Sequence, residues 1–305
     1  MSIIKYGGSG SSATWSSRAF PDAHVHSLSL AVTPLEILRL DGTLHAHGTA
    51  FIYRVAESLY LVTAWHVVSG RDFFSRKLNS DGLIPASFAL YTPSFEQEGD
   101  ILHIRSNRFS LELERAALDK LESPPQVFGA PVDLAVAKLP MSTTKSGSFS
   151  SKGLNEFQWG FPERTTPPLQ SMIGADVFVL GYPLRTYEGL RTPIWKRGSL
   201  ASEPSFQIDP LGAFLVDVNS AGGMSGGPIV RRVTILTADN KDAGVVQEFY
   251  DEAVIGIYSG RALSKDESSF VLGYGWPIDL VHEIIATGQC FSGDELPSEL
   301  PTSDP

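Results

Sequence analysis

Residues 213–228 read AFLVDVNSAGGMSGGP, a short apolar segment followed by a turn crowded with glycine. Glycine has no Cβ, so it reaches positive φ and lets another backbone or a ligand come close. A hydroxyl at Ser225 in such a turn would lie beside the backbone N–H groups of Gly223 and Ser225, which could together bind an oxyanion. An ordinary glycine-rich hairpin loop has the same composition. The stretch therefore needs partners elsewhere in the chain before it indicates a nucleophile.

Two other segments supply such partners. His66 lies near the end of LYLVTAWHVV, whose apolar content predicts a buried strand, and Asp133 opens DLAVAKL, a second short apolar strand. Taken alone, such a His is more often a buried core residue than a catalyst, and such an Asp is usually a turn residue. Together with Ser225 they provide the base, the orienting carboxylate and the nucleophile of acyl transfer. They also follow the chain order His, Asp, Ser of chymotrypsin-type enzymes.

With these residues the chain resembles the trypsin-like serine proteases, and among them the bacterial and high-temperature-requirement type. LVTAWHVV is similar to the TAAH segment of that family, and GGMSGGPIV is similar to its GxSGGP nucleophile motif. The other matching segments are GTAFI (48–52), DLAVAKL (133–139), VFVLGYP (177–183) and VIGIYSG (254–260). The last of these resembles the strand that lines the primary pocket and pairs with bound peptide.

The resemblance implies an all-β fold of two perpendicular six-stranded antiparallel β-barrels, chymotrypsin-like, with a C-terminal helix. The residues agree, because short apolar segments alternate with turns such as Asp41-Gly42, and DLVHEIIATG has the period of a helix that ends at Gly288. We expect a flexible N-terminal segment (1–24), a first barrel carrying His and Asp (25–140), a linker (141–170), a second barrel carrying Ser plus the terminal helix (171–290), and a disordered acidic tail (291–305).

The same resemblance implies a serine endopeptidase that works through an acyl-enzyme intermediate. Its catalytic triad would be His66, Asp133 and Ser225, and its oxyanion hole would be formed by Gly223 and Ser225. Met224 stands where digestive relatives have the Asp that pairs with the amine freed when a zymogen is cut. A thioether cannot hold a buried ammonium ion, so we expect that N-terminal processing does not form this oxyanion hole.

The expected substrate-binding residues are Asn219, Tyr258, Ser259, Gly260, Arg261 and Leu272. Ser259 also matches the position that hydrogen-bonds the triad carboxylate. Asn219 matches the base of the primary pocket, and a neutral Asn offers no counter-charge to a Lys or Arg side chain. Because Tyr258 and Leu272 would narrow the pocket, we predict a small or medium neutral P1 residue. Arg261 makes an acidic P1 residue the alternative.

Two other classes of function remain open at this point. The first is a non-catalytic peptide-binding module on the same fold, although no triad member is missing. The second is an esterase, because residues 223–227 read GMSGG and satisfy the GxSxG pattern of α/β-hydrolases. Those enzymes place their His last, however, and the only His after Ser225 is His282, in the predicted helix. Of the rival carboxylates, Asp176 lies in the second half, where the family has a turn, and Asp100 and Asp217 match no family motif.

Composition limits the classes of molecule that the protein is expected to bind and the compartment in which it is expected to work. The net charge of −10 disfavours binding to nucleic acid, and we find no apolar run long enough to span a membrane. A single cysteine, Cys290, and the lack of a signal-like N-terminus favour the cytoplasm, with the periplasm left open. An intracellular protease of broad specificity would be harmful. We therefore expect a polypeptide substrate and, for control, a regulatory protein partner.

Paired histidines raise the question of a metal. His24 and His26, like His45 and His47, are two residues apart, which places both imidazoles of a pair on one strand face. No cysteine or carboxylate cluster accompanies them in the sequence. We therefore expect no metal and no other cofactor.

Overall fold

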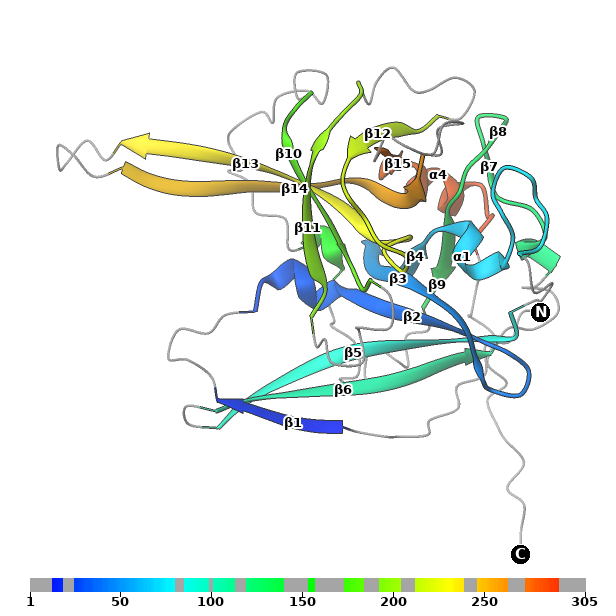
Figure 1. Cartoon of the computed structure of the whole chain (residues 1–305), viewed down its shortest axis with the longest axis horizontal. Coiled ribbons are helices and arrows are strands. Elements are labelled where there is room, and N and C mark those ends of the chain that lie inside the picture. The colour runs from blue at the N-terminus through cyan, green and yellow to red at the C-terminus, as the bar shows by residue number, and fades with distance from the viewer. Residues whose placement is uncertain are drawn as a thin grey trace, which may run out of the picture.

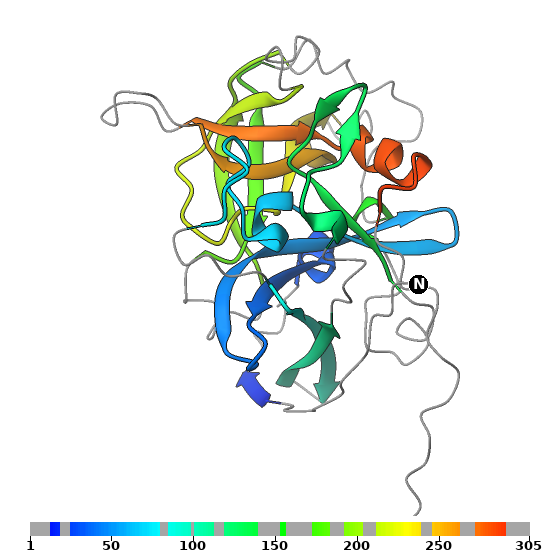
Figure 2. The same cartoon turned by 90° about the vertical axis from the view of Figure 1, so that its right-hand side faces the viewer.

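The computed structural model describes residues 13–18, 25–79, 85–98, 101–112, 119–139, 153–156, 173–183, 192–203, 212–238, 246–262 and 272–290. Within them the chain forms two large β-sheets, one from each half. Both views of the molecule show the two sheets one above the other (Figures 1 and 2).

The second half is a closed barrel with the strand order β10-β11-β12-β15-β14-β13. Its strands are β10 (Asp176–Gly181), β11 (Ile194–Leu200), β12 (Phe214–Asp217), β13 (Pro228–Ala238), β14 (Val246–Arg261) and β15 (Leu272–Pro277). Side chains alternate in and out along a strand, so Val177 and Val179 of β10 are both fully buried inside the barrel. The β13–β14 hairpin extends well away from the barrel (Figure 1).

The first half is a half-barrel sheet with the strand order β1-β6-β5-β2-β3-β4-β9. Its strands are β1 (Ala13–Arg18), β2 (Val32–Leu38), β3 (Leu44–Val55), β4 (Ser58–Thr63), β5 (Ser87–Glu98), β6 (Ile101–Glu112) and β9 (Ala135–Lys138). The predicted turn between β2 and β3 is present: Gly42 has φ +78°, and Asp41 Oδ1 accepts a hydrogen bond from the Thr43 N–H at 2.9 Å. Leu35, Phe51 and Val62 are fully buried in the core of this half.

This is the predicted two-barrel, chymotrypsin-like architecture, and α4 (Asp279–Ala286) is its C-terminal helix. The first sheet has seven strands where six were predicted. Part of the reason is that Ala13–Arg18, inside the segment expected to be flexible, pairs antiparallel with β6. Outside the described residues lie 1–12 and 19–24, the tail 291–305, and the expected linker apart from 153–156. Those four residues include the 3-10 helix η2 (Leu154–Glu156).

Short elements complete the structure: η1 (Ser27–Ala31), α1 (Trp65–Ser69), β7 (Gln126–Val127) and β8 (Ala130–Pro131). The hairpin of β7 and β8 lies beside α4, as Figure 2 shows, and the Gln126 N–H donates to Gln289 Oε1 at 2.7 Å. In the described part of the chain, no helix is long and apolar enough to cross a lipid bilayer.

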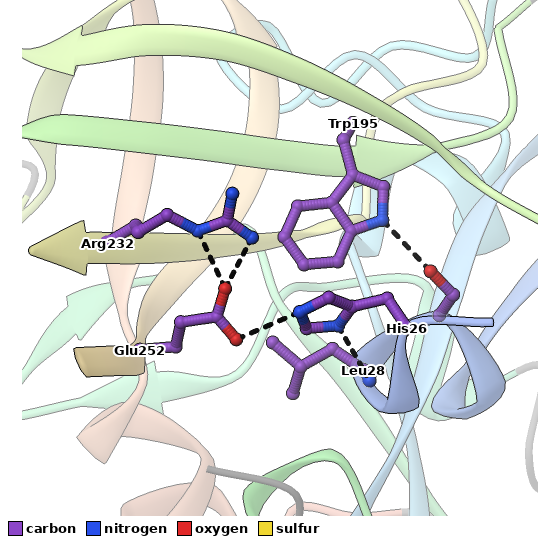
Figure 3. Close-up of polar contacts among 6 residues, drawn as sticks. His26, Leu28, Trp195, Arg232 and Glu252 are labelled. Carbon is purple, nitrogen blue, oxygen red and sulfur yellow. Dashed lines mark hydrogen bonds and ion pairs between the residues drawn. The ribbon is translucent and has the colours of Figure 1, made fainter. Parts of the chain in front are cut away.

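A cluster of charged and aromatic side chains joins the start of the first half to the second barrel (Figure 3). The buried carboxylate of Glu252 on β14 accepts two hydrogen bonds from the guanidinium of Arg232, and its other oxygen lies 3.2 Å from His26 Nε2. The Trp195 ring packs against the His26 ring at 4.5 Å, and its Nε1–H donates to Ser29 Oγ at 2.9 Å. These contacts help to fix the two halves against each other.

Candidate active site

His66 lies in α1, the short helix that directly follows β4. Trp65 and Val68 of this helix face the core, which leaves His66 on the partly exposed side. His66 Nδ1 is 2.7 Å from Asp133 Oδ2, and the backbone N–H of His66 donates to Asp133 Oδ1 at 2.8 Å. A carboxylate only accepts hydrogen bonds, so Nδ1 carries the proton and Nε2 is left as an acceptor. This is the tautomer that a general base needs.

Asp133 precedes β9 and is almost completely buried, with 1% of its side chain exposed. Its carboxylate accepts a third hydrogen bond, from Ser259 Oγ to Oδ2 at 2.5 Å. Ser259 belongs to β14, where the pairing with β15 shifts register between Tyr258 and Arg261. Such irregularities re-aim side chains. Here the irregularity lies at Ser259, whose side chain reaches from the second half to the carboxylate of Asp133.

The pKa of the His66 imidazole is set by opposing effects of its surroundings. Burial lowers the pKa of the imidazole, but the negative charge of Asp133 and the hydrogen bond to it raise the pKa, and the more distant Asp72 adds to this effect. The net result is a pKa above the ordinary value of 6.5. Such a histidine is well matched to accepting a proton near neutral pH.

Ser225 lies in the glycine-rich loop between β12 and β13, and the predicted glycine conformations are present. Gly223 has φ +92° and Gly226 has φ +87°. The Gly226 N–H donates to Tyr258 O at 2.7 Å, which ties the loop to β14. Within the described residues, the backbone N–H groups of Gly223 and Ser225 donate no hydrogen bond. These two donors are therefore available to an oxyanion, and their binding of one stays a prediction.

The nucleophile loop packs directly against the segment that carries His66. A Cβ added at Gly48 would meet Val67 Cγ1 at 2.6 Å and Ser225 O at 3.2 Å. Gly48 therefore lies so close to the residue after His66 and to the backbone of Ser225 that only a hydrogen fits in place of a side chain. The glycine of the GTAFI segment is explained by this close approach.

The second barrel brings Ser225 close to the carboxylate side of the site as well. A Cβ added at Gly260 would lie 3.5 Å from Ser225 Oγ, and the preceding residue, Ser259, holds Asp133. Within the described residues no hydrogen bond joins Ser225 Oγ to His66. Catalytic hydrogen bonds of this kind are often long without substrate and shorten in the complex. Segments distant in sequence thus bring the three predicted catalytic residues into one region.

Tyr258 is buried beneath this region. Its hydroxyl shares a short hydrogen bond with Ser220 Oγ, and Arg261 Nη2 donates to Ser220 O at 2.8 Å. The ring occupies the space left by Gly273, because a Cβ there would come within 2.3 Å of Tyr258 Cε2. Ser220 and Gly273 were not identified from the sequence, although both lie next to residues that were, Asn219 and Leu272.

The remaining expected pocket residues differ in their surroundings. Asn219 and Arg261 are exposed, whereas Gly260 and Leu272 are partly buried. Leu272 pairs in register with Asp217, at the end of the barrel where β12 and β15 meet. The residues expected to shape the pocket therefore lie around Ser220 and Tyr258, and their roles toward substrate stay predictions.

The rival carboxylates have other surroundings. Asp176 forms an ion pair with Arg197 at 2.8 Å on the surface, and Asp217 is exposed. Asp100 lies outside the described residues. The ring of His282, the only His after Ser225, makes a hydrogen bond with the hydroxyl of Tyr53 at 3.3 Å from helix α4.

The paired histidines do not form a metal cluster in the part of the chain that the structure describes, where no three His, Cys, Asp or Glu side chains gather. His24 is outside the described residues, and His26 contacts Glu252. His47 has a different neighbour: a Cβ added at Gly223 would meet its ring at 2.9 Å. This histidine therefore lies against the nucleophile loop.

Comparisons with known proteins add little. No family model matches the chain, and no curated protein sequence matches it. Among solved structures, the active form of the Rv3671c protease from M. tuberculosis is 15% identical to this chain, with a TM-score of 0.36. The match covers 85% of this chain and 81% of the protease. The thermostable serine protease AL20 from an extremophilic microorganism is 12% identical, with a TM-score of 0.35. That match covers 82% of this chain and 91% of AL20. At this level of similarity neither structure bears on the activity of this chain.

Proposed function

We propose that this protein is a serine endopeptidase that cleaves peptide bonds with Ser225 as nucleophile, His66 as base and Asp133 as the orienting carboxylate. One observation carries the proposal. Asp133 binds both N–H groups of His66 that face it, at 2.7 and 2.8 Å, while the adjoining loop presents Ser225 beside two backbone N–H groups with no hydrogen-bond acceptor of their own. A base in the right tautomer, a nucleophile and an oxyanion site are the parts that acyl transfer requires.

The chemistry follows from these positions. Ser225 Oγ attacks the peptide carbonyl carbon, and its proton passes to His66 Nε2. The carbonyl oxygen becomes an oxyanion, which the N–H groups of Gly223 and Ser225 bind. When the C–N bond breaks, His66 gives its proton to the leaving amine. Water then attacks the acyl-enzyme by the same route and releases the acid, which restores Ser225.

Of the alternatives, the α/β-hydrolase version of an esterase is contradicted by the fold, which is a pair of β-sheets. A non-catalytic peptide-binding module and an esterase on the present fold remain to be separated by experiment. The two N–H donors and the fixed tautomer of His66 favour an enzyme, because a module that only binds peptide needs neither.

The test is labelling of the full-length protein with a fluorophosphonate, which phosphonylates an activated serine, followed by intact-mass measurement and peptide mapping. We expect one adduct, on Ser225, that is absent in Ser225→Ala and His66→Ala and retained in the control Ser199→Ala on β11. Undiminished labelling of Ser225→Ala overturns the assignment. Incubation with a peptide library and with matched esters then distinguishes the substrates: cleavage of esters alone identifies an esterase.

A further inference from the structure

Thr49 lies where the first sheet touches the nucleophile loop. It belongs to β3 and is completely buried. Its backbone N–H donates to Ser225 O at 2.9 Å, and its side-chain hydroxyl donates to Gly223 O at 2.7 Å. One residue of the first half therefore holds the carbonyl groups on both sides of Met224.

The direction of the Thr49 hydroxyl proton is fixed by a third partner. The backbone N–H of Tyr182, which can only donate, is 3.0 Å from Thr49 Oγ1. A hydroxyl has one proton, and with Tyr182 supplying the other hydrogen bond, that proton must point at Gly223 O. The hydroxyl is thus used both as acceptor, from Tyr182 directly after β10, and as donor, to the loop.

The loop has little freedom to move away from this contact. Gly223 has φ +92°, and a Cβ on it would meet Tyr182 O at 2.5 Å and the His47 ring at 2.9 Å. The Gly223 Cα is therefore in close contact with the backbone of Tyr182 and with the imidazole of His47. With the carbonyl held by Thr49, rotation about the bonds of Gly223 would break a buried hydrogen bond, which leaves polar groups unsatisfied.

We propose that Thr49 is a positioning residue for the oxyanion site: its hydroxyl keeps Gly223 and Ser225 in the conformation in which both N–H groups face the reacting carbonyl. This inference rests on the proposed function. It predicts that Thr49 acts on the transition state and not on the binding of substrate in its ground state. The first half of the protein would then supply, besides His66 and Asp133, the contact that forms the oxyanion site.

The experiment compares Thr49→Val, which keeps the shape but loses the hydroxyl, with Thr49→Ser, which keeps the hydroxyl. For Thr49→Val we expect kcat to fall by about 10- to 100-fold with KM little changed, below the ~10²–10³ lost when an oxyanion donor itself is removed. The affinity for a peptide aldehyde, whose hemiacetal oxygen uses the oxyanion site, should fall by a similar factor. Binding of the cleaved product peptide should not change, and Thr49→Ser should restore most of the loss.

Thr33 offers a matched control. Its buried hydroxyl also both donates and accepts, to Tyr91 O at 2.6 Å and from Tyr91 N at 2.9 Å, but it joins β2 to β5 away from the loop. Thr33→Val should lower the melting temperature while kcat and aldehyde affinity are kept. If Thr49→Val behaves like Thr33→Val, Thr49 is only structural and the inference is wrong. If Thr49→Val does not fold, Thr49→Cys, a weaker donor of similar size, must show the same split between aldehyde and product affinity.

The inference and the proposed function fail in different ways. If wild-type protein neither reacts with fluorophosphonate nor cleaves peptides, the function is wrong and the Thr49 experiment has no basis. If the wild type does both and Thr49→Val keeps full kcat and aldehyde affinity, only the role of Thr49 is refuted.

Discussion

Ser259 Oγ donates a hydrogen bond to Asp133 Oδ2 at 2.5 Å, and this bond joins the second barrel to the carboxylate of the first half. The same carboxylate binds the backbone N–H and the Nδ1–H of His66. Asp133 therefore has three donors around it and is almost completely buried. The position of His66 depends on both halves through this one side chain.

Ser259→Ala should weaken catalysis through that dependence. A hydrogen bond to a charged group contributes about 1.5–3 kcal/mol, so we expect kcat/KM to fall by about tenfold or more. Ser199→Ala on β11 is the control and should retain wild-type kinetics. Equal kcat/KM in Ser259→Ala and wild type would show that Asp133 holds His66 without help from β14.

The activity should rise with pH as His66 loses its proton. The pKa of His66 is raised above 6.5, so the protonated, inactive form persists to higher pH than for a free imidazole. The pH profile of kcat/KM for a neutral peptide should therefore have its acidic limb above pH 6.5.

Asp133→Asn removes the charge that raises the pKa of His66 and leaves the lowering effect of burial. The acidic limb should then move to lower pH. The plateau rate should drop by about 10⁴, because an amide can select the wrong tautomer of His66. An acidic limb that stays in place in this variant would mean that another group controls it.

The sequence predicted the parts of this fold that local patterns encode. The Asp41-Gly42 turn and the helix with its stop at Gly288 (φ +68°) appear where their residues indicated. Strand β1 was missed, because Ala13–Arg18 sits in a Gly- and Ser-rich segment and becomes a strand only by pairing with β6, far along the chain.

The candidate site likewise has parts that local sequence patterns encode and parts that depend on long-range contacts. His66, Asp133 and Ser225 stand in local motifs that could be recognised one by one. The contacts of Thr49 with Gly223, and of Gly273 with the Tyr258 ring, form between residues from separate strands and loops. No pattern within a short stretch of sequence encodes such contacts, so they became visible only in the folded chain.

The buried Tyr258 ring should restrict the P1 side chain. We predict cleavage after small or medium neutral residues, and Tyr258→Val should increase kcat/KM for Leu or Phe at P1 by about tenfold or more relative to Ala. Tyr258→Phe keeps the ring, loses the bond to Ser220, and should keep the wild-type preference. Profiling of a peptide library decides this: dominant Lys or Arg at P1 would refute the prediction, and dominant Asp or Glu would favour the exposed Arg261 as the determinant.

Glu252 should stabilise the junction between the halves in a pH-dependent way. Burial raises the pKa of its carboxyl, but the hydrogen bonds from His26 and Arg232 together lower it by more. The pKa therefore lies below 4.5. A depressed pKa contributes stability above pH 4.5 that is lost as the pH falls through the folded-state value.

Glu252→Gln should therefore lower the free energy of unfolding by about 2 kcal/mol at pH 7, where charged hydrogen bonds are lost. The difference from wild type should shrink below pH 4.5. Asp176→Asn, which breaks the exposed pair with Arg197, is the control and should cost less than about 1 kcal/mol. Denaturant titrations at both pH values measure this, and equal losses in the two variants would argue against a role for burial.

Processing of the N-terminus should not be needed for the chemical step. Met224, immediately before the nucleophile, is buried with 2% of its surface exposed, and its thioether cannot pair with an ammonium ion. A protein truncated to begin at Ala23 loses β1 and leaves the edge of β6 unpaired, so its melting temperature should fall. Its rate of reaction with fluorophosphonate should match that of the full-length chain, because Thr49, which the truncation keeps, holds Gly223 O. Intact-mass analysis during the reaction shows which species is labelled. If only molecules cut near the N-terminus react, and blocking the cut by mutation keeps the protein inert, a new terminus does form the site in spite of Met224.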